Sequence, residues 1–345
     1  MTSPLLTVEN LRVDFGAGSS ALHAVRGVDF VVRRGETLGI VGESGSGKSV
    51  TALSILRLIS SPGRIVDGLV HFNGTDLLKT PEKALRDIRG SRIAMVFQDP
   101  LTSLNPVLTI GDQIVETIRE HRRTNPASFL GTPPETEGGG VRKRISKKEA
   151  WAEALSLLRQ VNMTLPERRL RQYPFELSGG MRQRAMIAMA FSCRPELLIA
   201  DEPTTALDVT VQAQILDLMD TLRKDYGTSV ILITHDLGIV AERCDDVAVM
   251  YAGQIVEFAP AADLFASPQH PYTRALLASL PDWRRPRTVD PLPALPGHPP
   301  DLTSDFTGCP FAPRCPEVMD TCMSTVPART AVDGGRRYVR CLRVE

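Results

Sequence analysis

The feature that most constrains this chain is a glycine-rich segment, GESGSGKS at residues 42–49, which fits G-x-x-x-x-G-K-[ST] at every fixed position. A short apolar run at 37–41 precedes it, and a helical pattern at 50–58 follows. Glycines let backbone N–H groups turn inward around phosphate oxygens, and the helix N-terminus adds its positive dipole end. We expect Lys48 to bridge the β- and γ-phosphates and Ser49 to offer its hydroxyl to Mg²⁺. The segment predicts binding of a nucleoside triphosphate such as ATP. The residues expected around its phosphates are Gly42, Glu43, Ser44, Gly45, Ser46, Gly47, Lys48 and Ser49.

The charge balance argues against a chain that coats nucleic acid or an anionic membrane. Among 345 residues, 40 Lys and Arg stand against 40 Asp and Glu, so the formal net charge is +0. No apolar run reaches the roughly 18 residues that span a bilayer. Charged residues also occur where a signal peptide would be apolar. We expect a cytosolic chain with no nucleic-acid partner.

The hydrophobic pattern predicts an α/β fold. Residues 5–15 and 28–33 alternate apolar and polar positions, which indicates antiparallel strands with one solvated face. Apolar strand-like runs then alternate with helical patterns, which indicates a mainly parallel sheet covered on both faces. These runs lie at 37–41, 93–97, 197–200, 230–234 and 247–250. The prediction is a P-loop NTPase (RecA-like) core with an N-terminal antiparallel β subdomain.

Two further regions stand out from this core. Residues 105–190 lack strand-like runs and predict an inserted α-helical subdomain. Within it, residues 124–148 are rich in Pro and Gly and then basic, which predicts an exposed flexible loop. From residue 256 to 345 the chain becomes rich in Pro and Cys, which predicts an irregular C-terminal extension beyond a cassette at 1–255.

A second half of the nucleotide site is predicted at residues 197–202, an apolar strand that ends in two carboxylates. We expect Asp201 to hold Mg²⁺ and Glu202 to accept a proton from the attacking water. Adjacent carboxylates repel each other, and a bound cation relieves that repulsion. The pair therefore predicts the part of the site that binds the metal and activates water.

Between the two halves lies LSGGM at residues 177–181, followed by a helical pattern. A helix that opens with Ser-Gly-Gly offers a second anion-binding end. With this motif the chain resembles the ATP-binding subunits of ABC transporters, over roughly residues 5–255. The resemblance implies that Ser178, Gly179 and Gly180 contact the nucleotide of a partner subunit in a head-to-tail dimer. Met181 stands where that family usually has Gln.

Four other residues match positions with roles in that family. The resemblance implies that Gln98 contacts Mg²⁺ or the attacking water and senses the membrane subunit. Asp208, in the segment 206–208, matches the loop that crosses the dimer interface, and His235 matches the histidine that contacts the γ-phosphate. Phe15 stands where the family places an aromatic ring against adenine, although a strand aromatic is by default a core residue. The implied catalytic residues are Lys48, Gln98, Glu202 and His235. Because every catalytic position is filled, we predict a hydrolysis-competent site.

The C-terminal region resembles one branch of the family, the dipeptide/oligopeptide importer ATPases. The resemblance rests on FQDPLTSLNPVLTIGDQI, YPFELSGGMRQRAMIAMA, HPYTRALLASLP and the tail GCPFAPRCPEVMDTC. It implies an ATPase subunit at the cytoplasmic face of the membrane. Its implied partners are two transmembrane permease subunits, a second and related ATPase subunit, and, indirectly, an extracytoplasmic solute-binding protein.

Four cysteines in this tail are spaced C-x5-C-x6-C-x18-C. In a cytosolic chain such a group favours a metal site over disulfides. The absence of a C-x2-C pair weakens a zinc-ribbon interpretation, and the spacing alone leaves iron–sulfur and zinc equally open. The resemblance implies a [4Fe–4S] cluster. Its ligands would be Cys309, Cys315, Cys322 and Cys341.

Two alternatives remain at this point. A soluble ABC ATPase that is not coupled to transport would share residues 5–255. An importer of another solute, such as nickel chelates, would share the tail as well. A P-loop kinase or GTPase shares only residues 42–49, and the presence of both LSGGM and His235 argues against it.

Overall fold

The computed structural model describes residues 4–18, 21–124, 145–205, 207–279, 295–332 and 334–344. The chain divides into two compact units, residues 1–79 with 232–345, and residues 80–231. The predicted flexible loop falls largely on residues outside the described ones. Among the described helices, none is both long enough and apolar enough to cross a membrane.

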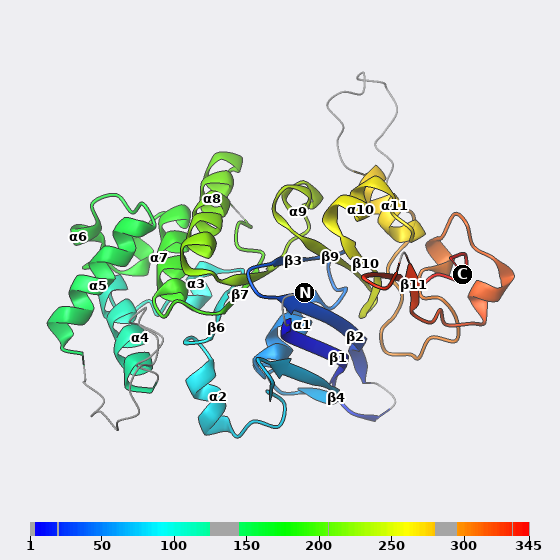
Figure 1. Cartoon of the computed structure of the whole chain (residues 1–345), viewed down its shortest axis with the longest axis horizontal. Coiled ribbons are helices and arrows are strands. Elements are labelled where there is room, and N and C mark those ends of the chain that lie inside the picture. Colours follow the sequence, from blue (N-terminus) through cyan, green and yellow to red (C-terminus); the bar gives the residue numbers. More distant parts are fainter. Residues whose placement is uncertain are drawn as a thin grey trace, which may run out of the picture. The chain divides into compact units, whose positions relative to one another are not determined.

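The first unit contains an antiparallel sheet of four strands in the order β2-β1-β4-β5. Figure 1 labels three of them, β1, β2 and β4. Its members are β1 (Pro4–Phe15), β2 (Leu22–Arg33), β4 (Gly63–Phe72) and β5 (Thr75–Asp76). The alternating apolar residues of β1 and β2 are buried, which confirms the predicted β subdomain. The sequence analysis missed β4 because only Val70 and Phe72 are buried in that strand. Its apolar alternation is therefore too short to predict a strand.

The same unit contains the strand that leads into the glycine-rich segment. β3 (Thr37–Val41) is buried at all five positions and pairs in parallel with β9 (Asp246–Tyr251). β10 (Gln254–Pro260) pairs antiparallel with β9, and β12 (Arg337–Val339) and β11 (Thr330–Val332) extend the sheet beyond it. The C-terminal region thus supplies three strands that the sequence analysis did not predict.

The C-terminal region also shares a hydrophobic core with β3 and β9. It contributes α10 (Ala261–Ala266) and α11 (Pro271–Ala278), and its aromatic side chains pack with those of β9. The rings of Tyr251, Tyr272 and Phe311 meet with centroids 4.6 to 5.4 Å apart. Aromatic contacts at such distances are favourable beyond the area that they bury. They fix the described part of the tail against the sheet.

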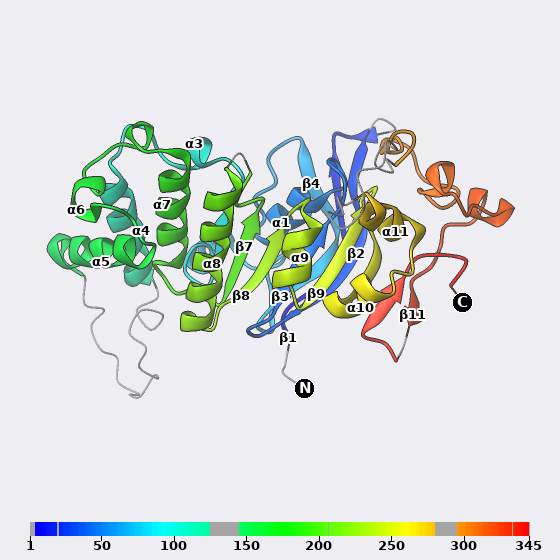
Figure 2. The same cartoon turned by 90° about the horizontal axis from the view of Figure 1, so that it is seen from above.

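The second unit includes α2 (Glu82–Ile88), β6 (Ile93–Val96), β7 (Leu197–Asp201) and residues 229–231 of β8 (Ser229–Ile233). The strand order is β8-β7-β6. β6 and β7 are parallel, as predicted. The region predicted to be a helical subdomain contains α4, α5, α6 and α7, which lie close together in Figure 2. Their bounds are Ile110–Thr124, Lys147–Gln160, Pro166–Arg169 and Gly179–Phe191.

The start of α5 corrects one end of the predicted loop. The Ser146 hydroxyl accepts a hydrogen bond from the Glu149 N–H at 3.2 Å, and the Glu149 carboxylate accepts one from the Ser146 N–H at 2.8 Å. This capping box starts the helix at Lys147. The basic residues Lys147 and Lys148 therefore belong to a first helical turn and not to the loop.

Candidate functional site

The phosphate loop connects β3 to α1 (Lys48–Ile55), so the helix begins two residues earlier than predicted and ends three residues earlier. Gly47 occupies the N-cap position with a φ of 99°. The buried Lys48 ammonium donates hydrogen bonds to the carbonyl oxygens of Gly42 at 2.8 Å and Glu43 at 2.9 Å. The loop thus folds around its own lysine, with the helix N-terminus beside it.

The fit of this loop to phosphate rests on its backbone and on one hydroxyl. At Gly42 φ is 151°, and a methyl group there would overlap the carbonyl oxygen of Met250 on β9. Glycine is therefore required for the close packing of loop against strand. The Ser46 hydroxyl is buried and has no hydrogen-bond partner in the described structure. An unsatisfied buried hydroxyl favours a polar ligand such as phosphate.

Phe15 is half-buried at the end of β1. It pairs with Leu22 on β2 and with Gly63 on β4. The absence of a side chain at Gly63 makes room for the ring, since a Cβ there would lie 2.6 Å from a ring carbon of Phe15. Stacking of this ring on adenine stays a prediction.

The predicted carboxylates lie at the end of β7. Asp201 is buried, whereas Glu202 is half-buried and has a φ of 45°, an uncommon value for a residue other than glycine. The Gln98 amide donates to the Glu202 carboxylate at 3.1 Å. Thr205 also donates to this carboxylate, at 2.9 Å. The structure therefore brings Gln98 and Glu202 together and adds Thr205, which the sequence analysis missed.

The predicted dimer-contacting residues begin two helices of the second unit. Ser178 is the N-cap of α7, and its hydroxyl accepts a hydrogen bond from the Met181 N–H at 3.4 Å. Ser178 and Gly179 are exposed, so the start of this helix is open to an anion. Asp208 is the N-cap of α8 (Val209–Tyr226) and accepts from the Val211 N–H at 3.0 Å. Ala206, also part of the predicted loop, lies outside the described residues.

His235 follows β8 and is exposed. The next residue, Asp236, is the N-cap of α9 (Leu237–Arg243) and accepts hydrogen bonds from the N–H groups of Gly238 and Ile239. The cap fixes the turn in which the histidine sits. The role of His235 toward a γ-phosphate stays a prediction.

The four tail cysteines lie in one part of the first unit and influence one another electrostatically. Burial is the main cause that raises the pKa of the Cys309 thiol to about 11, and it also raises the pKa of Cys315 and Cys341. The Cys309 N–H donates to the Cys322 carbonyl at 2.7 Å. Across the described ranges, however, no three His, Cys, Asp or Glu side chains are gathered closely enough to hold a metal ion. The structure therefore does not show the predicted cluster as a formed site.

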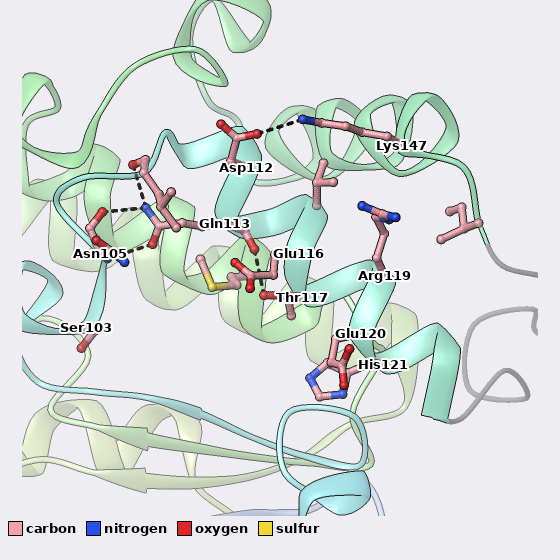
Figure 3. A pocket seen from close by; sticks show the side chains of 14 residues that line it. Ser103, Asn105, Asp112, Gln113, Glu116, Thr117, Arg119, Glu120, His121 and Lys147 are labelled. Atoms are coloured by element: carbon pink, nitrogen blue, oxygen red, sulfur yellow. Dashed lines mark hydrogen bonds and ion pairs between the residues drawn. The ribbon is translucent and has the colours of Figure 1, made fainter.

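The second unit also contains a groove of about 1000 Å³, lined mainly by α4 (Figure 3). Buried Gln113 fixes one rim, since its amide donates to the carbonyls of Asn105 and Leu108 at 3.0 Å and accepts from the Asn105 N–H at 2.9 Å. The lining is mostly polar and charged. Its ionisable residues are Asp112, Glu116, Arg119, Glu120, His121 and Lys147.

Comparisons with known proteins match both regions of the chain. The ABC transporter family profile matches residues 25–205, and the profile for the C-terminal region of oligopeptide/dipeptide transporters matches residues 256–322. A probable peptide ABC transporter ATP-binding protein of Sinorhizobium fredii is 52% identical, over 96% of this chain and 92% of that protein. The oligopeptide transport ATP-binding protein AppD of Bacillus subtilis is 48% identical, over 99% of this chain and 98% of that protein. Among solved structures, a dimeric ATP-binding cassette with ADP and phosphate has a TM-score of 0.62 and 25% identity, covering 74% of this chain and 98% of that one.

Proposed function

Because the chain belongs to the ABC transporter family and is an ATPase, we propose that it powers the import of di- and oligopeptides through separate membrane permease subunits. The observation that carries the peptide assignment is the match of residues 256–322 to the C-terminal region of oligopeptide/dipeptide transporters. Named relatives that transport oligopeptides and match almost the whole chain support it.

The proposed chemistry is phosphoryl transfer from ATP to water. The ammonium of Lys48 and the loop amides stabilise phosphate charge, as P-loops do in general. Ser49, Gln98 and Asp201 would hold Mg²⁺, which when bound neutralises charge that develops on the phosphates. Glu202 accepts the proton of the attacking water while the water oxygen bonds to the γ-phosphorus. The bond from the γ-phosphorus to its bridging oxygen breaks, and ADP leaves. Hydrogen bonds from Gln98 and Thr205 orient the Glu202 carboxylate. His235 would contact the γ-phosphate.

The exposed N-terminus of α7 supports a head-to-tail pair of ATPase subunits. Ser178, Gly179 and Gly180 would contact the partner's nucleotide, and Asp208 would lie at the interface between subunits. The resemblance to this branch implies pairing with a second, related ATPase subunit, so we propose a heterodimer. ATP would then lie against Phe15 and the phosphate loop of one subunit, and the partner subunit would supply the remaining contacts.

The groove beside α4 would receive a permease segment. Its lining combines polar and charged side chains with apolar ones, and such a mixed surface, with its rim fixed at Gln113, suits a protein partner. Docking there would place the chain at the cytoplasmic face of the membrane. A Glu116→Arg variant tests this assignment: we expect normal MgATP binding but loss of co-purification with the permeases.

A [4Fe–4S] cluster on the four cysteines, with zinc as the alternative, is proposed from the branch resemblance. Two observations on the described residues support it. The thiols are close enough to affect one another's pKa. Backbone N–H groups also donate hydrogen bonds to three of the sulfurs, from Phe311 to Cys309, from Glu317 to Cys315 and from Arg343 to Cys341. Such a cluster would hold the tail together structurally. Anaerobically purified protein should be brown, whereas a colourless preparation with one zinc per chain would contradict the iron–sulfur assignment.

The experiment that tests the proposed function is transport by the assembled complex. We expect proteoliposomes that contain the chain, its permeases and their solute-binding protein to take up labelled peptides only with ATP. A Lys48→Ala variant should abolish uptake. Uptake of a nickel chelate in place of peptides would favour the other importer assignment, and ATP hydrolysis with neither permease association nor uptake would favour a soluble ATPase.

A further inference from the structure

One residue of the phosphate loop, Glu43, is held from two sides by the C-terminal region. Its backbone N–H donates a hydrogen bond to the Tyr272 hydroxyl at 2.9 Å. Its carboxylate accepts two hydrogen bonds from the Arg314 guanidinium, at 2.7 and 2.9 Å. The Arg314 side chain is only 5% exposed, so this bidentate pair is largely shielded from water.

Arg314 is itself fixed in place. Its Nε donates to the Pro296 carbonyl at 2.8 Å, and its guanidinium also donates to the Tyr251 hydroxyl at 3.3 Å. It ends a short 3₁₀ turn, Ala312–Arg314, between Cys309 and Cys315. The hydrogen bonds with Glu43 are the main cause that raises the pKa of Arg314, and the guanidinium is therefore charged at neutral pH.

Tyr272 is equally constrained. It is completely buried and sits in the first turn of α11, where the His270 imidazole accepts a hydrogen bond from its N–H at 3.0 Å. The Phe311 ring packs on it edge to face at 5.4 Å. Both contacts that the tail makes with Glu43 therefore come from rigid, packed side chains.

These contacts bear on nucleotide binding because Glu43 also holds the catalytic lysine. The Lys48 ammonium donates to the Glu43 carbonyl, so a shift of Glu43 moves both the lysine and the adjoining loop amides. A loop that is preorganised for phosphate binds more tightly than one that must be ordered on binding. We propose that Arg314 and Tyr272 are positioning residues of the phosphate loop, through which the cysteine-bearing tail sets the affinity for MgATP.

The first test measures MgATP affinity by titration calorimetry on the purified full-length chain. If loss of the Arg314 contact lowers the competent loop population to about a tenth, the Kd of Arg314→Gln rises about tenfold. Tyr272→Phe should weaken binding in the same direction. Arg274→Gln is the matched control, because Arg274 is another tail arginine and pairs with Glu317 at 2.6 Å. This control should leave the Kd unchanged.

A double-mutant cycle separates positioning from general stabilisation. Because Arg314 acts through Glu43, Arg314→Gln should add no further loss of affinity in a Glu43→Gln background. In the assembled transporter, Arg314→Gln should raise the KM for ATP while kcat at saturating ATP stays within about twofold. Arg314→Lys keeps the charge but not the bidentate geometry, so its Kd should lie between those of wild type and Arg314→Gln. If Arg314→Gln does not fold, Arg314→Lys takes its place in the test.

Three results would overturn the proposal. The first is an unchanged Kd in folded Arg314→Gln or, if that variant does not fold, in Arg314→Lys. The second is an equal loss in Arg274→Gln. The third is an Arg314→Gln effect that persists in full when Glu43 is already Gln.

Discussion

Replacement of Gly42 by alanine should damage the protein far more than the same change at Gly45, although both glycines belong to one loop and both have positive φ. The added methyl at Gly42 would overlap the carbonyl oxygen of Met250, well inside the 3.0 Å that real Cβ contacts respect. At Gly45 no heavy atom lies within 4 Å of the new methyl. Both variants carry backbone strain, so the contrast reports mainly the packing of the loop against β9.

The expected magnitudes follow from these two terms. Gly45→Ala pays only for a left-handed backbone, about 1–2 kcal/mol of unfolding free energy. Gly42→Ala carries backbone strain of about 1–3 kcal/mol and overpacking of a further 1–3 kcal/mol or so. The free energy of unfolding should therefore be about 2 kcal/mol lower in Gly42→Ala than in Gly45→Ala. Urea unfolding of the nucleotide-free chain measures the difference, and equal stabilities for the two variants would refute the packing argument.

Two buried ionisable groups give further predictions. Burial holds the pKa of His270 at about 3, so the unfolded chain, with an ordinary histidine pKa near 6.5, binds more protons between these values. The contribution of neutral His270 to the free energy of unfolding is complete above pH 6.5 and falls by about 2 kcal/mol by pH 5. Urea unfolding of wild type and His270→Gln across pH 5–8 measures this contribution. The urea midpoint of the variant should depend less on pH than that of wild type. Asp246 is buried and pairs with Arg33 at 3.2 Å and Arg336 at 3.0 Å. Asp246→Asn should lower the free energy of unfolding by about 2 kcal/mol, a moderate loss because both arginines are partly solvated. A free energy of unfolding equal to that of wild type at pH 7, within measurement error, would contradict a stabilising role of the Asp246 carboxylate.

The sequence predicted the nucleotide-binding elements because their signals are local. A buried five-residue strand, a fixed glycine spacing and a helix start can be read within residues 37–58. The carboxylates at 201 and 202 follow a second such strand, and their place at its end is confirmed. Local sequence determines these strands, the loop and the helix start, so a short stretch of neighbouring residues is enough to predict them.

The remaining features depend on partners far apart in the sequence. The pair of Glu43 with Arg314 spans 271 residues, and no spacing rule could propose it. The sequence HPYT at 270–273 marks the branch, but its physical role can be seen only in the folded structure. There the buried Tyr272 hydroxyl accepts a hydrogen bond from the Glu43 N–H of the phosphate loop. Likewise, β12 shows too little hydrophobic alternation to predict a strand, and β10 becomes its neighbour only after folding.

The measurement that tests the central claim most directly is ATP turnover by Glu202→Gln in the assembled transporter. The carboxamide keeps the shape and can retain the contact with Gln98, but it cannot accept the proton of water. The account predicts MgATP binding close to wild type, phosphate release reduced by at least about a hundredfold, and accumulation of a nucleotide-bound pair of subunits. Phosphate release near the wild-type rate would contradict the role given to Glu202 and, with it, the proposed mechanism.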